Sequence, residues 1–171
     1  MPIARYYAPD GAYAICVYTG IIDRATIRDH LVDHVADPLH RATMPEISDL
    51  RNIEDLQLDF GSMRGVVREK NDAYRVQKTI SVFAPGDVAF GVARIYQSLA
   101  EADGGIQVSV FRTEAETLAF HDFAAESIAE LLKGCVAREV REQPTAATLD
   151  PEASVDDDLL PKRRLSGSVI P

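Results

Sequence analysis

Short apolar runs alternate along this chain with segments whose apolar residues lie three or four positions apart. Residues 3–8 and 12–19 are strand-like, and Pro9-Asp10-Gly11 between them favours a turn, so the two predict a hairpin. Three further strands are expected at 47–50, 79–84 and 106–111, and the last follows a strict period of two.

Helical periodicity fills the stretches between these strands. Asp23 and Asp59 are suited to cap helices over 24–36 and about 60–75. A third helix follows Gly86, and Thr113 with Glu116 forms a capping box that opens a fourth helix, expected to continue to about 141. The positions expected to be buried are Ile27, Leu31 and Val35 in the first helix, Met63, Val66, Val67, Tyr74 and Val76 in or just after the second, and Val88, Val92, Ile95, Tyr96 and Leu99 in the third.

The order of elements is therefore β-β-α-β-α-β-α-β-α. Helices that alternate with strands predict an α/β fold with a mostly parallel five-stranded sheet, to which the hairpin adds one antiparallel edge. We expect a domain over 1–123, a helical extension over 124–142, and a flexible tail over 143–171 that is rich in Pro, Ser, Ala and Asp. The apolar stripe at 128–140 must fold back on the domain or pair with a second copy, and we favour a homodimer.

Composition limits the classes of partner. The 171 residues carry a net charge of −9, which disfavours nucleic acid and anionic membranes as partners. No apolar run approaches the roughly 20 residues that cross a bilayer, and the first residues lack the pattern of a secretion signal. Cys16 and Cys135 favour two free thiols over a disulfide, so we expect a cytoplasmic protein.

Sequence motifs for common catalytic and cofactor sites are missing. Gly86 and Gly91 have the spacing of a phosphate-binding loop, but Val92 and Ala93 follow where Lys and Ser or Thr are required. We expect Gly91, Ala89 and Ala93 to let their helix lie close to the sheet instead. His30 and His34 are one helical turn apart and lack the glutamate of a zinc protease, so a plain helix flank is preferred over a metal site. We expect no cofactor, no metal and no enzymatic activity.

Several stretches resemble one bacterial family. These are the hairpin that ends in Tyr-Thr-Gly-Ile-Ile, the Ser-Asp-Leu-Arg-Asn-Ile stretch at 48–53, and VFAPGDVAFGVARIYQSLAE followed by VSVFRTEAETLAF. Over about residues 3–123 the chain resembles the SpoIIAA-like family, which is related in fold to STAS domains and to the SEC14/CRAL-TRIO lipid-binding fold.

The resemblance implies a non-enzymatic module that acts by binding. In STAS-type members a serine after the third strand is phosphorylated by a partner kinase. Here that position falls near Leu58, which has no hydroxyl, and a shift of the loop would present Ser62 instead. The surface expected to bind a protein partner comprises Ser62, Arg64, Arg68, Glu69 and Lys70. The alternative function, implied by the SEC14 relationship, is binding or carriage of a small apolar ligand or lipid.

Overall fold

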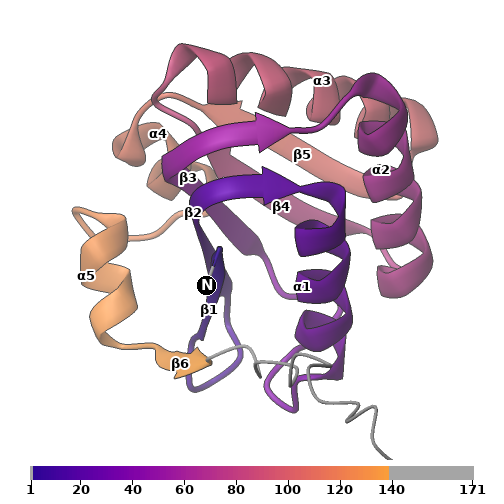
Figure 1. Cartoon of the computed structure of the whole chain (residues 1–171). Coiled ribbons are helices and arrows are strands. Elements are labelled where there is room, and N and C mark those ends of the chain that lie inside the picture. The colour runs from indigo at the N-terminus through magenta and orange to yellow at the C-terminus, as the bar shows by residue number, and fades with distance from the viewer. Residues whose placement is uncertain (1, 139–171) are drawn as a thin grey trace, which may run out of the picture. The chain divides into compact units, whose positions relative to one another are not determined.

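A mixed six-stranded sheet forms the centre of the computed structural model, which describes residues 2–138 (Figure 1). Its strands are β1 (Ile3–Tyr7), β2 (Ala14–Asp23), β3 (Glu46–Gln57), β4 (Lys78–Phe83), β5 (Ile106–Phe111) and β6 (Val136–Arg138), in the order β5-β4-β3-β2-β1-β6. Strands β2 to β5 are parallel, whereas β1 runs antiparallel to both β2 and β6.

The expectation of a mostly parallel five-stranded sheet is therefore wrong, although the α/β class is confirmed. The opening hairpin does form, but β1 is not the edge of the sheet, because β6 pairs with its outer side. The residues of β6 had been assigned to the last predicted helix.

The helices lie on both faces of the sheet. Helices α1 (Arg24–Ala36), α2 (Phe60–Tyr74) and α3 (Asp87–Asp103) pack on one face, while α4 (Glu114–Phe120) and α5 (Ile128–Lys133) pack on the other (Figure 1). The alternation of β2 separates the two cores, because Cys16 belongs to the cluster under α1–α3 and Ile15 to the cluster under α4 and α5.

The predicted N-caps are confirmed. The Asp23 carboxylate accepts a hydrogen bond from the backbone N–H of Thr26 at 2.7 Å, and the Asp59 carboxylate accepts one from Ser62 at 2.6 Å. Each cap satisfies a backbone donor that the first helical turn leaves free. Helices α1 and α2 therefore begin where the sequence predicts.

The last predicted helix is broken into separate elements. The expected helix over 113–141 is instead α4, a loop, α5 and β6. Asp122 has φ +56°, which ends the α4 turn, and the Ser127 hydroxyl caps α5 by accepting from the Glu130 N–H at 3.1 Å. The helical extension expected over 124–142 is thus mostly not helical, and the expected tail at 143–171 lies outside the described residues.

The apolar stripe that begins at residue 128 lies against its own sheet. Ile128 is fully buried, and Leu131, Leu132 and Cys135 pack on the same cluster. As far as residue 138, the stripe therefore needs no second copy to cover it.

The ends of β2 and β3 curl away from the rest of the sheet. Their pairing has register shifts between Val17 and Thr19 and between Gly20 and Ile21, and Gly20 has φ +69°. Such bulges bend and twist strands, and glycine adopts this conformation without strain. The curled ends carry Leu50, Ile53 and Leu56 against the core under α1–α3 (Figure 1). This curl makes one wall of the pocket described below.

Within residues 2–138, no helix combines the length and apolar character needed to cross a membrane.

Candidate ligand site

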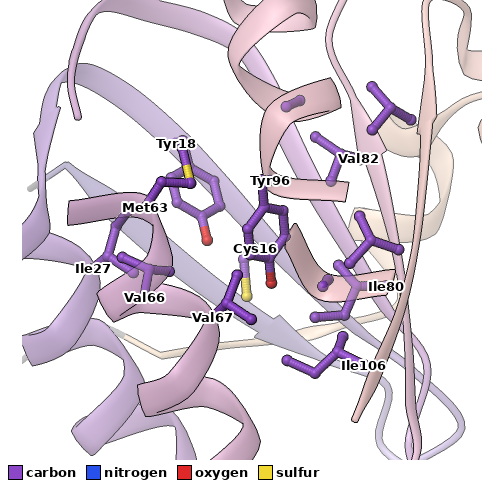
Figure 2. Close-up of a cluster of buried hydrophobic side chains, with 14 of the residues drawn as sticks. Cys16, Tyr18, Ile27, Met63, Val66, Val67, Ile80, Val82, Tyr96 and Ile106 are labelled. Carbon is purple, nitrogen blue, oxygen red and sulfur yellow. The ribbon is translucent and has the colours of Figure 1, made fainter. Parts of the chain in front are cut away.

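An apolar pocket of about 70 Å³ lies between helices α2 and α3 and the curled ends of β2 and β3. Figure 2 shows Tyr18, Met63, Ile27, Val66 and Tyr96 converging in this region between the helices and the sheet. Its full lining is Tyr18, Ile22, Ile27, Ser48, Leu50, Leu56, Leu58, Met63, Val66, Lys70, Val82, Val92, Ala93 and Tyr96. We call this space the apolar pocket.

The wall nearest the solvent is formed by half-buried residues. Leu56, Leu58 and Val92 are each partly exposed, whereas Ile22, Met63 and Val66 on the inner side are buried. A small molecule would therefore enter between the curled end of β3 and helix α3.

Lys70 places a charged group in the wall of this otherwise apolar pocket. Its side chain is buried, and its Nζ lies 5.5 Å from the centre of the Tyr96 ring. The Tyr96 hydroxyl is also buried and makes no hydrogen bond of good geometry within the described part of the chain. The pocket thus has the Lys70 ammonium group and the Tyr96 hydroxyl side by side at one end.

Behind Lys70, one carboxylate is paired with two ammonium groups. Glu46 Oε1 lies 3.8 Å from Lys70 Nζ, and Glu46 Oε2 lies 3.4 Å from Lys78 Nζ. Glu46 and Lys78 are fully buried. Because removing any of these charges from water is costly, their packing together requires that they compensate one another. Two positive charges against one negative charge leave an excess of positive charge beside the pocket.

Hydrogen bonds extend this cluster toward β1 and α1. The Tyr74 hydroxyl donates to Glu46 Oε2 at 3.3 Å, and the Tyr7 hydroxyl lies 2.6 Å from His34 Nδ1. His34 Nε2 lies 3.3 Å from Glu46 Oε2. His30 stacks on the other side of His34, with ring centres 5.5 Å apart. We call Glu46, Lys70, Lys78, His34 and Tyr74 the buried charge cluster.

The charge states follow from these contacts. Burial alone would raise the pKa of Glu46, but Lys70 and Lys78 outweigh it and hold that pKa well below its usual range. Burial alone would lower the pKa of Lys70, but Tyr96 and Glu46 raise it well above its ordinary value. Burial lowers the pKa of His34, and Glu46 opposes this only in part. At neutral pH the cluster therefore holds the Glu46 carboxylate, a charged Lys70 and a neutral His34.

The residues predicted to bind a partner do not form one exposed set. Arg64 and Arg68 are exposed and Ser62 is half-buried at the start of α2. Glu69 is half-buried and accepts a hydrogen bond from Arg24 Nη2 at 2.6 Å. Lys70 points into the core, so its assignment to the surface is wrong. Of the predicted set, Arg64 and Arg68 are exposed and available to a partner.

An exposed aromatic residue lies next to these two arginines. Phe60 is 61% exposed and lines two surface hollows, of about 220 and 370 Å³, between α2 and α3. Arg64 and Arg68 line the first, and Arg94 and Ile95 line the second. We call Phe60, Arg64, Arg68, Arg94 and Ile95 the Phe60 surface.

The glycines near the start of α3 and the histidines of α1 form neither a phosphate loop nor a helix flank. Helix α3 begins at Asp87, whose carboxylate pairs with Arg112 Nη1 at 2.8 Å, and Gly91 is exposed with open space where a Cβ would lie. The expectation that small residues bring this helix close to the sheet is therefore wrong for Gly91, whereas Ala89 and Ala93 are buried as predicted. His30 and His34 are buried rather than on a helix flank, and the described residues contain no group of His, Cys, Asp and Glu placed to hold a metal.

Sequence reasoning missed the central members of the cluster. Glu46 and Lys78 are the first residues of β3 and β4, and each was assigned to the loop before its strand. Their pairing arises because Glu46 is in register with Ile80 on the adjacent parallel strand, next to Lys78. The sequence signal that could have indicated this pairing is that both residues lie at the starts of predicted neighbouring parallel strands.

The comparisons with known proteins find a similar solved structure. No family model matches the chain, and no curated protein matches it. It is similar to an uncharacterised protein of the DUF3478 family with a SpoIIAA-like fold from Shewanella loihica PV-4, at 11% identity and a TM-score of 0.45. That match covers 69% of this chain and 90% of the other. The neighbour has the type of fold that the sequence resembles.

Proposed function

We propose that this chain is a non-enzymatic module that binds a small apolar ligand in the apolar pocket. The observation that carries the proposal is a pocket walled by aliphatic side chains with a few polar groups at one end. Ligand sites in proteins combine these two features, because apolar walls supply affinity and a few polar groups fix orientation.

The size of the pocket limits the ligand. An engineered cavity of about 150 Å³ holds benzene, which has six heavy atoms. At about 70 Å³, the present pocket fits an apolar group of roughly three or four carbon atoms without rearrangement. This favours a small molecule over the lipid that the SEC14 relationship would permit.

The chemistry near the pocket supports binding rather than catalysis. Burial raises the pKa of the Cys16 thiol well above its ordinary value, which disfavours the thiolate that a nucleophile needs. Glu46 is held by Lys70, Lys78 and Tyr74 and is fully buried. A carboxylate in this setting balances charge inside the fold and has no open side for a substrate.

Two measurements test the proposal. Native mass spectrometry of protein purified gently from its own host should show a small added mass that denaturing conditions remove. In ¹³C-methyl NMR, a neutral probe, 2-methylpropan-1-ol, should shift the Met63 methyl signal saturably. Met44 is the internal control, because it is buried in a separate cluster with Tyr7 and Ala14. No added mass together with no saturable shift at Met63 would reject the function.

A second candidate function is recognition of a protein partner through the Phe60 surface. An exposed aromatic ring beside several arginines is typical of interface centres, where aromatic residues and Arg are enriched. Positive charge concentrated on a chain of net charge −9 suits an acidic partner. Phosphorylation of Ser62, next to this surface, would be the regulatory event.

A matched pair of variants tests this second candidate. Chemical crosslinking in host cells should trap a defined partner on the wild-type chain and on Glu54→Gln, and not on Phe60→Asp. Equal capture by Phe60→Asp would place the partner elsewhere. Intact-mass analysis of the host protein under several growth conditions tests Ser62, and absence of any phosphorylated fraction would reject its role.

Location and assembly are part of the same proposal. We place the protein in the cytoplasm, which suits its free thiols at Cys16 and Cys135. The homodimer expected from the stripe at 128–140 stays a prediction, and it has lost part of its basis because Ile128 to Cys135 pack on their own sheet. Residues 139 and 140 lie outside the described residues.

A further inference from the structure

We propose that the natural ligand of the apolar pocket is a short-chain carboxylate whose negative head binds at Lys70 and Tyr96. This inference rests on the proposed function and adds the chemical class of the ligand. Three observations carry it: the charge balance behind the pocket, the Tyr96 O–H donor at its end, and its apolar walls.

The excess positive charge beside the pocket would be neutralised by an anion. Lys70 and Lys78 both lie within 4 Å of one carboxylate, Glu46, and all three side chains are at most 5% exposed. Lys78 is nearer to Glu46, at 3.4 Å, than Lys70 is, at 3.8 Å. Glu46 therefore compensates the charge of Lys78 more closely than that of Lys70. A second carboxylate beside Lys70 would give each ammonium group its own counter-charge.

The position of Lys70 directs that anion into the pocket. Lys70 lines the pocket, whereas Lys78 does not and instead lies over the ring of Tyr74, 4.4 Å from its centre. An ammonium group has three N–H donors, and Glu46 can occupy only part of them. The remaining donors are available to a group in the pocket.

Tyr96 supplies a second donor for the same head group. Its hydroxyl is buried, lacks a hydrogen bond of good geometry, and belongs to the pocket lining. Lys70 can only donate to this hydroxyl, so within the described residues its own O–H proton has no acceptor, and a carboxylate oxygen would supply one. The Ser48 hydroxyl, also in the lining, lies 3.5 Å from Glu46 Oε1 and is thereby engaged.

The walls define the rest of the ligand. Met63, Val66, Val92 and Leu56 surround the space beyond the polar end. With a pocket of about 70 Å³, the tail has roughly three or four carbons, as in 2-methylpropanoate. The ligand class is thus a small branched or linear monocarboxylate.

The experiment compares 2-methylpropanoate with 2-methylpropan-1-ol, which shares its carbon skeleton and lacks the charge. Affinities are read from the Met63 methyl shift and from titration calorimetry at pH 7 and constant ionic strength. We expect the carboxylate to bind at least ten times more tightly than the alcohol, because hydrogen bonds to charged groups are stronger than neutral ones.

Variants assign the preference to its residues. Lys70→Met should reduce the carboxylate-to-alcohol ratio to below about threefold, because it removes the charge and leaves the apolar walls in place. Tyr96→Phe should weaken carboxylate binding several-fold. Lys70→Met leaves the Glu46–Lys78 pair intact and electrically balanced, so we expect it to fold. Arg68→Gln, an exposed cation on the same helix, is the control and should change neither affinity.

Each result has one meaning. Equal binding of carboxylate and alcohol to the wild type overturns this inference and leaves the proposed function standing. Carboxylate binding that survives Lys70→Met overturns it as well, because the head group is then held elsewhere. Binding of neither probe overturns the inference, and together with no added mass in native mass spectrometry it also rejects the proposed function.

Discussion

The Lys78 ammonium lies 3.4 Å from a Glu46 carboxylate oxygen, and both side chains have no exposed surface. Glu46 compensates Lys70 as well, so it holds together the charges under α1 and α2. Glu46→Gln should therefore lower the free energy of unfolding by about 3–5 kcal/mol, as expected when a buried ion pair loses one partner. Urea denaturation followed by circular dichroism measures this loss.

The control for that substitution is Glu54→Gln, which makes the same chemical change at an exposed position of β3. It should alter the unfolding free energy by less than about 0.5 kcal/mol. Lys70→Met should cost less than Glu46→Gln, because it leaves one carboxylate facing one ammonium group. If Glu46→Gln proved as mild as Glu54→Gln, the cluster would not have the compensating role assigned to it.

Acid should destabilise the protein before its carboxylates titrate. Burial lowers the pKa of all four histidines, that of His40 to about 4, so they stay neutral in the fold. In the unfolded chain they take up protons below about pH 6.5. Stability is thus complete above that pH and falls as the pH drops from about 6.5 toward 4, by up to about 1.4 kcal/mol per pH unit for each histidine.

Glu46 adds a second loss at lower pH. Its pKa is depressed in the fold, so its contribution is present above its ordinary value of 4.5 and disappears as the pH falls below it. Urea midpoints at pH 7.5, 6.5, 5.5 and 4.5 measure the histidine effect, and midpoints taken below pH 4.5 measure the loss at Glu46. His40→Gln should make the dependence between pH 6.5 and 4.5 shallower by about one proton. A midpoint that is constant from pH 7.5 to 5.5 would contradict neutral buried histidines.

The sequence predicts helices better than it predicts which side chains they bury. The boundaries of α1 and α2 follow from Asp23 and Asp59, because an N-cap is a local signal. In α3 the apolar pattern suggested Val88 and Ile95, yet these are 74% and 47% exposed. The buried face of α3 is Ala89, Ala93, Tyr96 and Ala100, since small residues let this helix lie close to the sheet.

The buried charge cluster was beyond sequence reasoning for a different reason. Because charged residues are mostly exposed, the sequence predicts that Glu46 and Lys78 are loop residues beside short strands. Their burial depends on strand register and on the helices above them, which are long-range features. The apolar pocket likewise depends on the bulges near Gly20, for which a lone glycine gave no specific signal.

Filling the pocket should separate stability from ligand binding. Ala93 is buried in the pocket lining, and Ala93→Val adds two carbons to open space. The gain from burial exceeds the lower helix propensity of Val, so the unfolding free energy should rise by up to about 1 kcal/mol. Binding of 2-methylpropan-1-ol should weaken at least tenfold. Ala102→Val, at an exposed position of α3, should lose about 0.5 kcal/mol and leave binding unchanged.

Helix α5 should stabilise the chain from within rather than by dimerisation. Ile128 is fully buried against Ile15, Ile47, Phe83 and Leu118, and its N–H donates to Glu114 Oε2 at 2.8 Å. Ile128→Ala should cost about 2–5 kcal/mol, as for other large-to-small changes in a core, and should leave the oligomeric state seen by analytical ultracentrifugation unchanged. Val136→Ala, at a position 38% exposed, should cost less than about 1 kcal/mol. If Ile128→Ala kept its stability but dissociated a dimer, α5 would instead pack on a second copy of the chain.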